Sequence, residues 1–179
     1  MAATYQDLKP DWDDNALNMG GTQQIGWYGS LPDFLTIAKP ASAPVDPLEE
    51  YVIATPHVMK TGKKMHQIYT EVNKGELDYE PLGSEDGGGF KVTGKLFIPG
   101  DTTKLNYFAN KVRQSKYIFL IPDADGLLNQ IGTEGFPATI KMAKKSSTND
   151  GVKGYECEVS AYMPHKLIYD AVVPTTPAA

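Results

Sequence analysis

Two short segments of this sequence have the residue types and spacing of known ligand sites. Residues 89–95 contain the glycine, glycine and lysine of a P-loop, in which backbone N–H groups at the start of a helix bind phosphate. The next residue is Leu96, which cannot bind magnesium, and the alternating pattern of a strand runs through the motif. Residues 123–126 resemble part of a calcium loop, but Gly132 stands where that loop needs a glutamate. We therefore interpret the two segments as a strand and a turn.

The histidines and the cysteine do not form a catalytic or metal-binding pattern either. His57, His66 and His165 lack the spacing of metal ligands. Cys157 is the only cysteine and lies on the apolar face of a predicted strand, where a small buried hydrophobe is expected. We expect no cofactor, no metal and no enzymatic activity, since a small hydrolase would need a polar cluster that the sequence does not contain.

Three carboxylates, Glu76, Asp78 and Glu80, alternate with Leu77 and Tyr79. This alternation predicts a strand with one acidic face. A glycosidase requires two carboxylates on either side of a cleft, one of them with a raised pKa, and a row of hydrated carboxylates does not provide this. Acidic faces are usually just hydrated, so the solvent side of an outer sheet is the simplest interpretation.

The composition excludes several broad classes of protein. The chain of 179 residues has a net charge of −5, so it is not built to bind nucleic acid by neutralising phosphates. One cysteine allows no intrachain disulfide, which excludes a disulfide-stabilised scaffold. We expect no signal peptide and no membrane span, hence synthesis in a reducing cytoplasm. With 17 glycines and 13 prolines, the composition favours short strands and extended connections.

One helix is predicted, between two strands. Residues 89–98 alternate with period 2, and the apolar residues Leu105, Phe108, Ala109 and Val112 then recur with the spacing of a helix over residues 101–115. Asp101 or Thr102 can cap this helix. Further strands are predicted at residues 25–28, 33–38, 51–55, 67–72, 76–80, 117–121, 127–131, 138–144, 155–163 and 166–173.

These elements predict a mainly β (α+β) fold: a β-sandwich or half-barrel with one flanking helix. Residues 21–173 form the single domain, preceded by an N-terminal arm at residues 1–20 that carries Trp12 and followed by a tail at residues 174–179. A turn at residues 146–151 joins two strands into a hairpin. Centred there, the hairpin would bring Lys141 near Glu156. Its buried side would be Tyr155, Cys157, Val159 and Ala161.

The order of these parts resembles the tail tube proteins (major tail proteins) of long-tailed bacteriophages and, more distantly, the tube subunits of contractile injection systems. The resemblance covers most of the chain. It rests on the acidic strand at 76–80, the strand at 90–98, the helix at 101–115, the closing strands at 138–163 and the long loop at 55–65. A sheet with short polar edges, a polar arm and a long loop also suits a subunit whose edges are covered by partners.

The resemblance implies a structural virion protein of the viral tail, assembled in the host cytoplasm. Six copies would form a hexameric ring, and stacked rings would conduct DNA without specific binding during DNA ejection. Tape measure and terminator proteins would be further partners. Glu76, Asp78 and Glu80 are then the candidate lining of the lumen, where three carboxylates per copy would make a strongly negative wall. The candidate inter-ring contacts are Trp12, Lys60, Lys63 and Lys64.

Other functions stay open at this stage. Within the same fold, the chain could be a tail terminator or a head–tail connector. Outside it, a monomeric β-sandwich that binds a ligand such as carbohydrate is the main alternative, with Trp12, Trp27 and Tyr28 as an aromatic platform.

Overall fold

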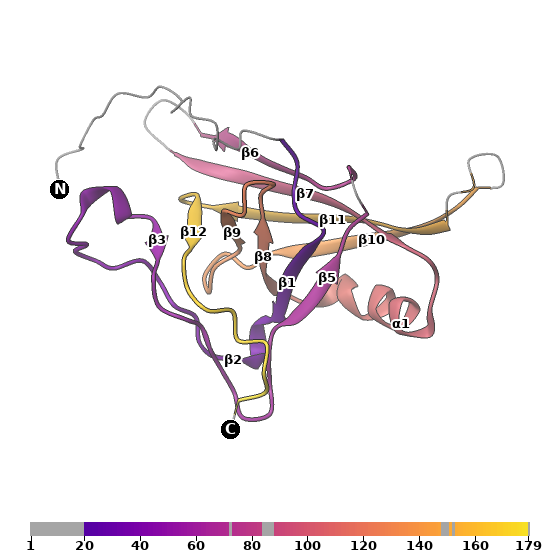
Figure 1. Cartoon of the computed structure of the whole chain (residues 1–179), viewed down its shortest axis with the longest axis horizontal. Helices are drawn as coiled ribbons and strands as arrows, with labels where there is room; N and C mark the ends of the chain where they lie inside the picture. The colour runs from indigo at the N-terminus through magenta and orange to yellow at the C-terminus, as the bar shows by residue number, and fades with distance from the viewer. Residues whose placement is uncertain (1–19, 72, 84–87, 148–150, 152, 179) are drawn as a thin grey trace.

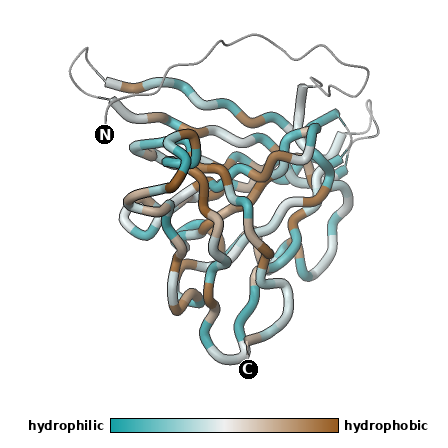
Figure 2. The backbone as a smooth tube through the Cα atoms, turned by 60° about the vertical axis from the view of Figure 1, so that its left-hand side comes forward, coloured by the Kyte–Doolittle hydropathy of each residue, from teal (hydrophilic) through white to brown (hydrophobic). Residues whose placement is uncertain are grey.

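A computed structural model gives the fold of the chain and describes residues 20–71, 73–83, 88–147, 151 and 153–178. The predicted fold class is confirmed: the described part is mainly β, with one α-helix and several sheets. The two large sheets pack face to face, and the strands of one run across those of the other (Figure 1). Hydrophobic residues concentrate toward the middle of the molecule, as Figure 2 shows.

The first large sheet has four antiparallel strands in the order β10-β11-β7-β6. Its strands are β6 (Glu76–Leu82), β7 (Gly89–Pro99), β10 (Thr139–Ser146) and β11 (Lys153–Met163). The predicted buried side of β11 is confirmed, because Tyr155, Cys157, Val159 and Ala161 are all buried. Strands β6 and β10 each pair on one side only, so both edges of this sheet are free among the described residues.

The second large sheet has six strands in the order β3-β12-β9-β8-β1-β5. Its strands are β1 (Ile25–Ser30), β3 (Val52–Ile53), β5 (His66–Tyr69), β8 (Tyr117–Pro122), β9 (Leu128–Ile131) and β12 (Leu167–Tyr169). Every residue of β8 is buried, since this strand is covered on both faces. A Cβ at Gly94 of β7 would lie 3.6 Å from Ile121 Cδ1 of β8, an ordinary contact distance, so the two sheets pack directly against each other at this position.

The single helix α1 (Thr103–Lys111) continues into a short 3-10 turn η3 (Val112–Gln114). Thr102 caps it, as expected, by accepting a hydrogen bond from Leu105 N–H at 3.3 Å. The apolar stripe faces inward: Val112 is buried and Phe108 is half-buried. The Phe108 ring lies 5.0 Å from that of Tyr28 on β1 and 6.2 Å from that of Tyr117 on β8.

A small two-stranded ribbon covers the far face of the six-stranded sheet. It consists of β2 (Phe34–Thr36) and β4 (Val58–Met59), and β2 follows the 3-10 turn η1 (Leu31–Asp33). The long loop predicted at residues 55–65 contributes to the core through its apolar residues. Met59 of β4 and Met65 are 3% and 1% exposed, and both belong to the buried core together with Phe34 of β2.

The last residues of the chain run along the same region. Met65 N–H donates to Pro174 O at 2.9 Å, and Ala178 N–H donates to Lys63 O at 3.0 Å. The predicted tail, as far as the structure describes it, is therefore docked on residues 61–65. Shortening that segment would remove part of the core as well as a surface loop.

Candidate functional site: the outer face of the four-stranded sheet

The outer face of the four-stranded sheet carries charged side chains at alternating positions along its strands. Glu76, Asp78 and Glu80 of β6 are all exposed on this face, as the period-2 pattern predicts. The face is slightly hollowed, and most of the residues that line the depression are lysines and glutamates.

One row of side chains crosses all four strands with alternating charge. Glu76 lies opposite Lys95, Lys95 opposite Glu158, and Glu158 opposite Lys141. Lys95 Nζ donates to Glu76 Oε2 at 2.8 Å, and this hydrogen bond is the main reason that the pKa of Lys95 is raised. Opposite charges that face each other across strands stabilise the pairing modestly.

The expected strongly negative wall is wrong for the face as a whole. Glu80 lies opposite Lys91, and Glu156 pairs with Lys145 at 3.3 Å. Five carboxylates share the face with four ammonium groups: Glu76, Asp78, Glu80, Glu156 and Glu158 with Lys91, Lys95, Lys141 and Lys145. Sequence reasoning did not place these lysines beside the carboxylates of β6, because they come from the other strands β7 and β10, and the pattern of one strand does not show which strands pair with it.

The two free edges of the sheet differ in charge. The charged side chains that edge strand β6 presents on the outer face are all carboxylates, whereas those of edge strand β10 are Lys141 and Lys145. In the predicted hairpin Lys141 lay near Glu156, but the observed register places it opposite Glu158. The reason is that Ser146 pairs with Lys153, which moves the centre of the turn toward β11.

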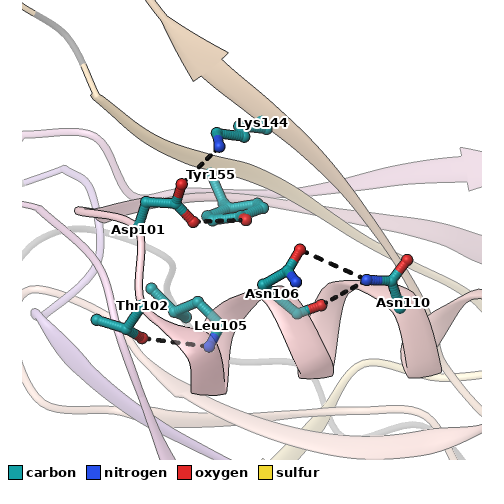
Figure 3. A network of polar contacts seen from close by, with 7 residues as sticks. All are labelled: Asp101, Thr102, Leu105, Asn106, Asn110, Lys144 and Tyr155. Atoms are coloured by element: carbon teal, nitrogen blue, oxygen red, sulfur yellow. Dashed lines mark hydrogen bonds and ion pairs between the residues drawn. The ribbon is translucent and has the colours of Figure 1, made fainter.

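A polar cluster fixes strand β10 relative to the start of α1 (Figure 3). Asp101 accepts hydrogen bonds from Lys144 Nζ at 2.5 Å and from Tyr155 Oη at 3.0 Å. The bond from Lys144, followed by that from Tyr155, holds the pKa of the Asp101 carboxyl below its usual range. One carboxylate thus ties the helix to both strands of the hairpin, including the basic edge.

The lysines predicted to contact a neighbouring ring lie on the segment after β4. Lys60 Nζ donates to Pro32 O at 2.6 Å, and Lys63 forms an ion pair with Asp33 at 3.2 Å. Lys64 is partly exposed. Two of the three lysines therefore also hold their own segment against η1. Trp12, the fourth predicted contact, lies outside the described residues.

The aromatic platform of the carbohydrate-binding alternative does not form. Trp27 and Tyr28 are neighbours on β1, so they point to opposite faces of the sheet. The Tyr28 ring packs between the sheets at 6.2 Å from that of Phe119, and burial raises the pKa of its hydroxyl. A single surface cannot hold both side chains.

A buried histidine connects three segments on the far side of the molecule. His57 is 3% exposed, and its ring lies 4.7 Å from that of Tyr169. His57 Nδ1 accepts a hydrogen bond from Ala38 N–H at 3.0 Å, and Tyr169 Oη accepts one from His57 N–H at 3.1 Å. Burial lowers the pKa of His57 to about 4. The residue is structural.

The described residues offer no separate chemical centre. Among them, no three His, Cys, Asp or Glu side chains come close enough together to hold a metal ion. Cys157 is buried, and burial raises the pKa of its thiol to about 12, so it is not a nucleophile. No helix in the described part of the chain is long and apolar enough to cross a bilayer. No family model, curated protein or solved structure matches the chain.

Proposed function

We propose that the chain is a structural subunit of a phage tail tube, which forms rings of six copies that stack around a channel for DNA. The resemblance in the order of elements supports this proposal. The observation that carries it is the four-stranded sheet, whose two free edges have opposite charges, acidic on β6 and basic on β10. Uncovered edges of long strands are a hazard in a monomer, and pairing between copies removes it.

The topology of this sheet suits a closed ring. All four strands are antiparallel and their number is even, so β6 of one copy can pair antiparallel with β10 of the next. Lys141 at the edge of one copy would then face the carboxylates of β6 in its neighbour. The alternation of acid and base would continue across the junction, which favours head-to-tail pairing of unlike edges over pairing of like edges.

In such a ring the outer face of the four-stranded sheet lines the lumen, with Glu76, Asp78 and Glu80 among its side chains. Its charges nearly balance, with a slight excess of carboxylates. A surface without excess positive charge does not hold phosphates by releasing counterions. DNA can then slide through the channel without binding to it.

Reversing one charge at the basic edge tests the proposal. Lys141→Glu should prevent rings, because it places an acid against the acidic edge of the next copy; Lys74→Glu, at an exposed position outside both edge strands, should still form them. Negative-stain images and sedimentation velocity in low salt provide the measurement. Edge pairing would be refuted if the Lys141→Glu variant formed rings as abundantly as the unmodified chain. The tube assignment would be refuted if the unmodified chain never formed rings at high concentration. A tail terminator or head–tail connector would form rings that do not grow into tubes.

A further inference from the structure

Two exposed surfaces of opposite charge lie outside the strands of the four-stranded sheet. The first is the acidic loop, residues 40–51, which contains Asp46, Glu49 and Glu50 and no lysine, arginine or histidine. The second is the basic helix face, formed by Lys104, Tyr107 and Lys111 of α1 with Arg113 and Lys116 beyond it. No acidic residue occurs between residues 102 and 122.

The acidic loop presents apolar side chains in a fixed shape. Val45 is 103% exposed and Leu48 is 54% exposed, although both are large hydrophobic residues. Three prolines, at positions 40, 44 and 47, restrict the backbone. Asp46 Oδ1 accepts a hydrogen bond from Leu48 N–H at 2.9 Å and caps the 3-10 turn η2 (Pro47–Glu49). A loop that is already ordered loses little entropy when it binds.

The basic helix face combines charge with an exposed aromatic ring. Lys104, Tyr107 and Lys111 stand at i, i+3 and i+7, which places them on one side of the helix. Tyr107 is 65% exposed, and Lys111 Nζ lies 5.7 Å from the centre of its ring. This face therefore offers an aromatic surface flanked by cations, which matches apolar side chains flanked by carboxylates.

The two surfaces cannot meet within one copy. The acidic loop lies at the left end of the molecule, next to β3, and α1 lies on the right, so they are separated along the longest axis (Figure 1). Within the described part of the chain, none of these charged side chains forms an ion pair: Asp46, Glu49, Glu50, Lys104, Lys111, Arg113 and Lys116.

We propose that consecutive copies contact each other end to end, with the acidic loop of one copy seated on the basic helix face of the next. The occupant of each surface is thus a second copy of this chain. The contact is heterologous, so it repeats from copy to copy. The strands of the four-stranded sheet run along the same axis (Figure 1), which makes this a contact between stacked rings. The inference rests on the proposed self-assembly and adds a contact that edge pairing does not supply.

Disulfide trapping between two variants tests the contact. Chains with Leu48→Cys are mixed with chains carrying Tyr107→Cys and oxidised at low salt; Cys157 is buried and stays silent. The control replaces Tyr107→Cys with Val172→Cys, whose parent residue is 80% exposed and lies on neither surface. The expected product is a mixed dimer, at least about tenfold more abundant with Tyr107→Cys than with the control. Near-ultraviolet circular dichroism checks that each variant is folded.

Charge reversal strengthens the test. Lys104→Glu with Lys111→Glu should reduce the mixed dimer by about tenfold, and adding Glu49→Lys with Glu50→Lys to the partner should restore it. A yield equal to the control, or a dimer formed by Leu48→Cys chains alone, would overturn the proposal. If rings form while this crosslink is absent, only the stacking contact is refuted; if no rings form, the tube assignment fails as well.

Discussion

At the scale of single residues, His57 makes the stability of the fold sensitive to acid. Its Nδ1 already accepts a hydrogen bond from Ala38 N–H, so the proton of the neutral ring is on Nε2. In the imidazolium both ring nitrogens carry a proton. Protonation would therefore place an Nδ1–H group against the Ala38 N–H and break this hydrogen bond. The groups that face the ring are Phe34, Gln130 and Tyr169, and none of them is charged at neutral pH.

The pKa of His57 therefore predicts where stability is lost. Its value is about 4 in the folded chain and about 6.5 in an unfolded one, so the unfolded state binds the proton first as the pH falls. The contribution of neutral His57 to the free energy of unfolding is fully present above pH 6.5. As the pH falls from 6.5 to 4, the free energy of unfolding decreases by about 3 kcal/mol.

His57→Gln should flatten this dependence, since the glutamine oxygen can still accept from Ala38 N–H and does not titrate. The exposed His66 provides the control, because His66→Gln should leave the loss unchanged. Urea unfolding at pH 7, 5.5 and 4 measures both. An unaltered pH profile in His57→Gln would mean that other groups control the acid sensitivity.

At the scale of elements, helix α1 is held by its apolar stripe and by the Asp101 cluster. Phe108→Ala should lower the free energy of unfolding by about 3 kcal/mol, because it removes a half-buried ring that packs on Tyr28 and Tyr117. Tyr107→Ala, on the exposed side of the same helix, should cost less than about 0.5 kcal/mol in the isolated subunit. Urea denaturation compares the two variants. Equal losses of unfolding free energy would mean that Phe108 does not face the sheets as described.

The elements that sequence reasoning predicted best are those with one buried face. Strands β7 and β11 and the stripe of α1 have a regular apolar period, because each packs against the core on one side only. The predicted register of the β10–β11 hairpin differs from the observed one, since a run of polar residues allows the turn to form at more than one position.

The ribbon β2–β4 and the burial of Met59 and Met65 were not predictable from local pattern. The methionines stand among lysines and glycines, and they are buried only because β2 and the last residues of the chain return to cover them. Likewise the lysines that balance Glu76, Asp78 and Glu80 come from β7 and β10. Charge on a sheet is set by pairing between strands, which a single strand does not reveal.

At the scale of the whole molecule, two kinds of contact account for a tube. Unlike edges of the four-stranded sheet would close a ring, and the acidic loop on the basic helix face would stack one ring on the next. The two contacts use different residues, so each can be removed while the other is retained. Losing the edge contact should leave chains without rings, whereas losing the end contact should leave rings without tubes.

The most direct test of the central claim is an electron cryomicroscopy structure of the assembled protein. The predicted result is a ring of six copies in which β6 of each copy pairs with β10 of the next and Glu76, Asp78 and Glu80 point into the lumen. Rings in which the four-stranded sheet faces outward, or in which its edges stay unpaired, would contradict the proposal.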